Sequence, residues 1–134
     1  MTVASDKLRS IVAQGWMGML ALLLLMMLTD LTEFGMKGDF SPLVRDPGMR
    51  GLWFIVVMAS VNVLVQMAVR TFEGAGFRRL TLGATVLYTL MFVGHQVTHL
   101  AKGEGFDLHT VLDVVHHALG IWASVAAYRW LTAR

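Results

Sequence analysis

The sequence predicts an all-α integral membrane protein, in which a single membrane domain, residues 1–134, forms an antiparallel bundle of four transmembrane helices. The first reason is composition: 56% of the residues are hydrophobic and only 15% are charged, against roughly 25% charged in soluble domains. A water-soluble domain of this length could not bury so much apolar surface. The second reason is that the charged residues fall at intervals that match the thickness of a bilayer.

The spacing of the charges gives the four spans. Three apolar stretches contain no charged residue, and a fourth, Leu108–Tyr128, contains only Asp113. About 20 residues of helix, at about 1.5 Å each, cross a hydrocarbon core of about 30 Å. Each span must be helical, because a lone spanning segment can satisfy its backbone hydrogen bonds only within itself. The predicted spans are residues 11–29, 51–69, 80–101 and 108–130.

The connections between the spans differ in length. Glu73–Gly76 and Lys102–Gly105 are short turns that contain glycine. Helices joined by such short turns are normally antiparallel neighbours, so the third and fourth spans should lie side by side. The first connection, Asp39–Gly51, contains both prolines and is expected to be irregular.

Lysine and arginine predict the orientation. The cytoplasmic side of a membrane protein carries more of these residues in its short loops. Here the N-terminal segment, the second connection and the C-terminus hold more of them than the first and third connections do. We therefore expect both termini in the cytoplasm, most simply of a bacterial inner membrane. The two groups are Lys7, Arg9, Arg70, Arg78, Arg79, Arg129 and Arg134 against Lys37, Arg45, Arg50 and Lys102.

Several classes of function are excluded by composition. The chain has no cysteine, which excludes disulfides, thiolate metal sites and cysteine nucleophiles. The net charge is only +2, and the basic residues form no patch with interleaved aromatic residues, so no nucleic-acid partner is expected. No P-loop, dinucleotide fingerprint or nucleophile elbow is present, and whether the chain is an enzyme stays open.

Polar residues recur at helical spacing in the third and fourth spans. Because lipid penalises such groups, the two polar faces should meet in a shared interior. For Thr85, Asn62, Gln66 and Ser124 the preferred interpretation is that they fasten the helices together. The predicted faces are Thr81, Thr85, Tyr88, His95 and His99 in the third span, and His109, Asp113, His116 or His117, Gly120, Ser124 and Tyr128 in the fourth.

All five histidines lie within residues 95–117, in the outer halves of these two spans. Helical rise places His95 about 10 Å and His116 about 12 Å from the third connection, at similar depth. The spacing His95-x-x-x-His99 is one that chelates a single metal ion. Our first hypothesis is a transition-metal centre (Zn, Fe or Cu) for metal handling or redox chemistry. Its expected ligands are His95, His99, Asp113 and His116 or His117, with His109, Asp30 and Glu33 as outer contributors.

Methionine bears on which metal is expected. The chain has ten methionines, and Met26, Met27, Met36 and Met49 lie towards the outer side, which would suit copper. Methionine is also an ordinary apolar filler, so copper is not preferred over zinc or iron on this ground.

Two short resemblances accompany these patterns. The segments His95–His99 and Asp113–His117 resemble the histidine boxes of membrane di-iron desaturases and hydroxylases, although those enzymes have further boxes that this chain lacks, and no activity is inferred. The run from His116 to Gly120, with Trp122 and Tyr128, resembles a haem-bearing helix of small cytochrome b membrane anchors, such as those of succinate dehydrogenase. That resemblance implies our second hypothesis, a b-type haem with His95 and His116 as axial ligands in an electron-transfer or quinone-linked subunit. Gly120 would then leave room for the macrocycle.

The third hypothesis needs no cofactor. A homo-oligomer or an accessory subunit of a larger membrane complex would use small residues for helix contact, and Gly15, Gly18 and Ala21 form such a face on the first span. The feature that argues against a purely structural role is Asp113, because a carboxylate at that depth would add little to the stability of a structural helix. A proton-relay role for Asp113 and the histidines is a further option, since imidazole titrates near neutral pH.

Overall fold

The computed structural model describes residues 3–41, 50–101 and 108–133. Within them the chain forms four α-helices and no strand. The predicted turn Lys102–Gly105 and most of the predicted first connection lie outside the described residues, whereas the second connection is the short segment 72–74. The helices are α1 (Val3–Lys37), α3 (Arg50–Thr71), α4 (Ala75–Ala101) and α5 (Leu108–Thr132).

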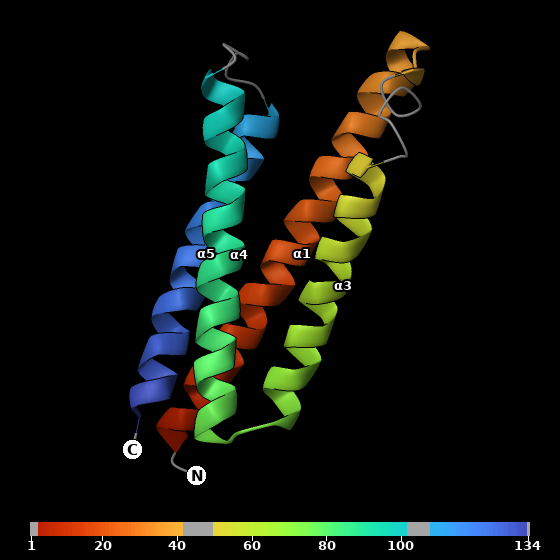
Figure 1. The fold of residues 1–134 in the computed structure, drawn as a ribbon. Coiled ribbons are helices and arrows are strands. Elements are labelled where there is room, and N and C mark those ends of the chain that lie inside the picture. The colour runs from red at the N-terminus through yellow and green to blue at the C-terminus, as the bar shows by residue number, and fades with distance from the viewer. Residues whose placement is uncertain (1–2, 42–49, 102–107, 134) are drawn as a thin grey trace.

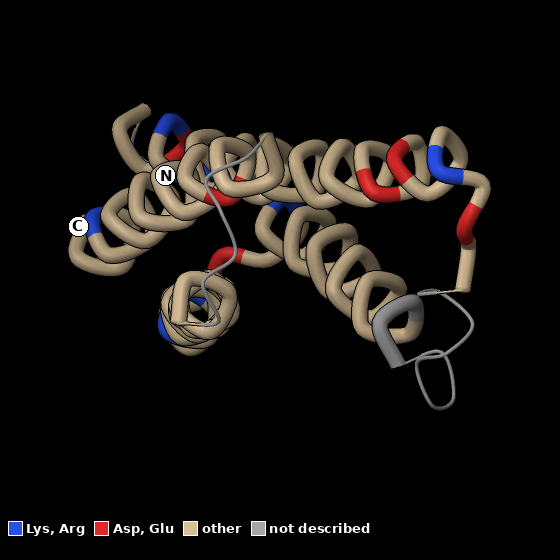
Figure 2. The backbone as a smooth tube through the Cα atoms, turned by 90° about the horizontal axis from the view of Figure 1, so that it is seen from above, with Lys and Arg blue, Asp and Glu red and all other residues tan. Residues whose placement is uncertain are grey.

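All four helices are long and apolar enough to span a membrane, which confirms the predicted all-helical architecture and indicates an integral membrane protein. Each predicted span lies within one helix. The first helix is the longest: its 35 residues extend over about 52 Å at 1.5 Å per residue, so it is longer than the hydrocarbon core is thick. Figure 2 shows that most of the length of the helices is free of charged residues.

The helices form two pairs that meet at one end and separate at the other (Figure 1). The main interfaces join α1 to α5, α1 to α3, and α4 to α5, so the prediction that the third and fourth spans are neighbours is confirmed. The start of α1 and the end of α5 lie at the end where the pairs meet (Figure 1). Below, the opposite end, where α1 and α3 diverge from α4 and α5, is called the open end.

Close backbone approach fixes the middle of the α1–α5 interface. A Cβ atom added at Gly15 would lie 2.6 Å from the Cβ atom of Ala123, and one added at Gly18 would lie 2.8 Å from Leu119. The small-residue face of the first span therefore packs against α5 of the same chain. The prediction that Gly15 and Gly18 form a helix-contact face is confirmed, and the helix they contact is α5.

Buried hydrogen bonds join the helices across the apolar core. The indole Nε1 of Trp16 donates to Thr85 Oγ1 at 3.0 Å, linking α1 to α4. The amide Nδ2 of Asn62 donates to the hydroxyl of Tyr88 at 2.6 Å, linking α3 to α4. The prediction that Asn62 and Thr85 fasten the helices together is confirmed.

Arg78 joins three helix ends where the pairs meet. Its guanidinium donates to the carbonyl of Trp130 at 2.8 Å and to Ser5 Oγ at 3.2 Å, and it lies over the Trp130 ring at 5.1 Å from the centroid. Trp130 is buried, whereas Trp53, near the start of α3, is exposed.

Candidate functional site

The polar face of α4 is buried along most of its length but not at the open end. Thr85 and Tyr88 are buried, as predicted. Further along, Gln96 is buried, whereas His95 is exposed and His99 is half-buried. The reason is the divergence of the helices: α1 and α3 lie away from α4 there (Figure 1), so the side of α4 that carries His95 is less covered.

His95 and His99 converge on each other. Their Nε2 atoms are 3.0 Å apart, and their ring centroids are 4.4 Å apart. Two imidazoles on one tetrahedral zinc ion, with Zn–N distances of about 2.0–2.1 Å, have their nitrogens about 3.0–3.5 Å apart. The separation fits a shared ion as well as an N–H···N hydrogen bond, so the i, i+4 spacing has placed two potential ligands together.

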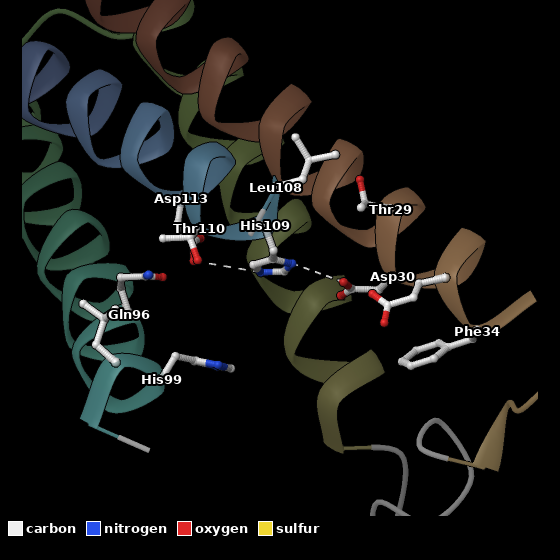
Figure 3. Close-up of a pocket in the computed structure, with 11 residues that line it drawn as sticks. Thr29, Asp30, Phe34, Gln96, His99, Leu108, His109, Thr110 and Asp113 are labelled. Carbon is white, nitrogen blue, oxygen red and sulfur yellow. Dashed lines mark hydrogen bonds and ion pairs between the residues drawn. The ribbon is translucent and has the colours of Figure 1, made fainter. Parts of the chain in front are cut away.

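His109, in the first turn of α5, lies between two carboxylates. Its Nδ1 atom is 3.1 Å from Oδ1 of Asp30 on α1, and its Nε2 atom is 3.9 Å from Oδ2 of Asp113. Figure 3 shows the ring between the two side chains. An ionised carboxylate only accepts hydrogen bonds, so Asp30 favours the proton on Nδ1. A neutral His109 then carries its lone pair on Nε2, the nitrogen nearer Asp113.

These groups line a cavity of about 310 Å³ at the open end, called the outer cavity below. Figure 3 shows side chains from α1, α4 and α5 around it. Its walls include two imidazoles and three carboxylates, and Gln96 adds a buried amide. Of the described side chains, Asp113 is the most deeply buried carboxylate in it, with 5% of its side chain exposed. The ionisable lining residues are Asp30, Glu33, His99, His109 and Asp113.

A smaller cavity of about 180 Å³ adjoins the outer cavity, with which it shares Asp30, His109 and Asp113. It is lined in addition by His95 and by two methionines of α1, Met26 and Met27. The two cavities together bring six of the eight residues that the sequence predicted for a metal centre to one region of the molecule.

The remaining two residues predicted for the metal centre are His116 and His117. His116 is 1% exposed, and its ring packs against Phe92 at 4.4 Å between centroids and against Tyr88 at 5.7 Å. His116 therefore faces the interior, while His117 is half-buried. Neither of the two cavities is lined by either residue. Both ring nitrogens of His116 are buried without a hydrogen-bond partner among the described residues.

Gly120 does not leave open space beside its helix. A Cβ atom added there would lie 2.5 Å from Oγ1 of Thr89 on α4. The space that the haem hypothesis reserved for a macrocycle is thus filled by the α4–α5 contact.

The potential ligands fall into two groups, the pair His95 and His99 and the cluster of Asp30, His109 and Asp113. Across the described ranges, no three histidine, aspartate or glutamate side chains converge closely enough to hold one ion. Sequence reasoning missed Gln96, although a glutamine between two histidines in an apolar span is itself a polar signal. It is 9% exposed and lines the outer cavity.

No protein-family model, curated protein or solved structure matches this chain. The chemistry of the site is therefore argued from its own donors: imidazole nitrogen, carboxylate oxygen and, in the smaller cavity, thioether sulfur. Such donors bind transition-metal ions.

Proposed function

We propose that this protein is an integral membrane protein that binds a transition-metal ion at its open end, for metal handling or redox chemistry. The observation that supports this best is the outer cavity, where imidazoles and carboxylates from three helices line one space. Ionisable side chains within membrane segments are rare and usually functional. A purely structural bundle would gain little from gathering them there.

The proposed ion is chelated first by His95 and His99, whose Nε2 atoms already lie 3.0 Å apart. Structural zinc ions take four ligands, and catalytic ones take at least three from the protein. We propose that His109 and Asp113 supply the remaining protein ligands. Asp30 then acts as the carboxylate that orients His109 through its Nδ1 atom, an arrangement common for metal-bound histidines.

The proposed topology is an antiparallel four-helix bundle with both termini in the cytoplasm of a bacterial inner membrane. The distribution of lysine and arginine supports this orientation. The open end then faces the non-cytoplasmic side. The cavity would thus be reached from outside the cell membrane, and α1, the longest helix, would extend beyond the bilayer on that side and carry Asp30 and Glu33.

A b-type haem is the second candidate, because His116 is a buried imidazole whose nitrogens have no partner among the described residues, as an axial ligand would be without its iron. The filled space beside Gly120 weighs against it. A cofactor-free subunit is the third, and exposed apolar side chains along all four helices are compatible with contact either to lipid or to another protein.

Metal analysis and an ultraviolet–visible spectrum of the full chain, purified in detergent and loaded with zinc, iron or copper, test the proposal. We expect about one ion per chain, and its loss in the double variant His95→Ala/His99→Ala. The control Asn62→Ala should retain the ion, because Asn62 bonds to Tyr88 away from the cavities. A Soret band that shifts on reduction would establish haem instead. Absence of both ion and haem from the wild-type chain would refute metal binding.

A further inference from the structure

The smaller cavity adds sulfur donors to the proposed site. Met26 and Met27 of α1 line it together with His95 of α4 and His109 of α5. The sequence places both methionines towards the outer side, as it does Met36 and Met49, but their approach to the histidines depends on how α1 packs.

Met26 is a buried residue at the wall of the smaller cavity. It is only 4% exposed, and it lines the cavity next to Leu23 and Phe92 of the apolar core. Met26 therefore lies where the apolar core ends and the space shared with His95 and His109 begins.

Thioether sulfur discriminates between metal ions. It is a soft ligand that favours monovalent copper, whereas imidazole binds copper, zinc and iron alike, and carboxylates favour harder ions. Two methionines beside the histidines therefore favour copper(I) over zinc or iron at this cavity.

We infer that the ion bound at the open end is monovalent copper, held by a thioether of Met26 or Met27 together with the imidazoles of His95 and His109. This inference rests on the proposed metal-binding function. It adds the identity of the ion, and it places a methionine sulfur among the ligands in place of His99 and Asp113. The carboxylates Asp30 and Asp113 lie at the same cavity, where they keep His109 oriented and offset the charge of an incoming cation.

The absence of cysteine makes a direct test possible. Because the chain has no cysteine and ten methionines, any sulfur bound to copper in this protein must come from methionine. X-ray absorption at the copper edge on the purified full chain, loaded with copper(I) under a reducing, oxygen-free atmosphere, should show copper–sulfur scattering. A spectrum with only nitrogen and oxygen neighbours would overturn the inference without any variant.

A variant series then assigns the sulfur. In Met26→Leu/Met27→Leu, which keeps the side chains apolar and close in volume, copper(I) affinity measured against a chromogenic competitor should fall at least tenfold. Zinc(II) affinity should change less than twofold. The matched control Met17→Leu/Met67→Leu, at two exposed positions, should bind both ions as the wild type does.

The outcomes separate the two proposals. If zinc binds at His95 and His99 but copper(I) affinity is unchanged in Met26→Leu/Met27→Leu, the copper inference fails and metal binding stands. If neither ion binds the wild-type chain, both fail.

Discussion

His109 Nδ1 lies 3.1 Å from Oδ1 of Asp30, so an imidazole in the first turn of α5 meets a carboxylate near the outer end of α1. The two residues are 79 positions apart in the sequence. Their contact links the same two helices that pack closely at Gly15 and Ala123. It places the proton of a neutral His109 on Nδ1 and leaves the Nε2 lone pair available for the proposed ion.

Replacing Asp30 with asparagine should weaken metal binding without unfolding the chain. The amide keeps the size of the side chain but removes the charge that orients and polarises His109. Loss of such an orienting partner typically lowers metal affinity about 10–100-fold. Competition titration with a chromogenic chelator measures the change. The control is Asp39→Asn, since Asp39 is exposed and bonds locally to the backbone of Ser41. Equal affinities of Asp30→Asn and wild type would mean that the contact serves only helix packing.

Asp113 should strengthen metal binding but lower the stability of the folded protein. Its side chain is only 5% exposed, and its Oδ2 atom lies 3.9 Å from Nε2 of His109, beyond hydrogen-bond distance. A buried carboxylate that is poorly paired destabilises the fold. We therefore expect Asp113→Asn to lose at least tenfold in metal affinity while its melting temperature in detergent stays equal or rises. A lower melting temperature with full metal content would assign Asp113 a structural role instead.

The α1–α5 crossing should be intolerant of even one added carbon. In Gly15→Ala the new Cβ would lie 2.6 Å from the Cβ atom of Ala123, which is fixed directly to the backbone and cannot rotate away. The helices must therefore move apart, at a cost of about 1–3 kcal/mol. Thermal unfolding in detergent should show a lower melting temperature.

Gly83→Ala is the matched control for this change. No described atom lies within 4 Å of a Cβ atom added at Gly83, and alanine favours a helix over glycine by about 0.5–1 kcal/mol. Its melting temperature should be equal to or above that of the wild type. If both variants were equally stable, the contact at Gly15 would not be as close as described.

The sequence predicted correctly those structural features that are determined within one segment of the chain. The spans followed from charge spacing, because the cost of placing a charge in lipid is felt residue by residue. The buried face of α4 was predicted correctly at Thr85 and Tyr88 but not at His95. Helical periodicity gives the face of one helix, and the divergence of its neighbours at the open end is a property of the whole assembly.

For the same reason, the sequence does not identify which segment packs against a given helix face. Gly15 and Gly18 were correctly identified as a helix-contact face, but the sequence does not say whether the partner is α5 or another chain. Likewise, the sequence places Met26 nearer the outer side than Met19, but it does not say what either side chain contacts. Only the packing of α1 shows that Met26 lies beside the smaller cavity and Met19 in the apolar core.

His116 provides the sharpest test between an ion and a haem. Its ring packs against Phe92 and Tyr88, and neither cavity is lined by it. Phenylalanine has a similar shape and no polar atoms, so His116→Phe removes two buried nitrogens that lack a partner among the described residues. Leaving such atoms buried is unfavourable. We expect His116→Phe to keep its bound ion and to melt at an equal or higher temperature. If the variant instead lost its ion or a Soret band, His116 would be a ligand, and the interior between α4 and α5 would have to open to admit the cofactor.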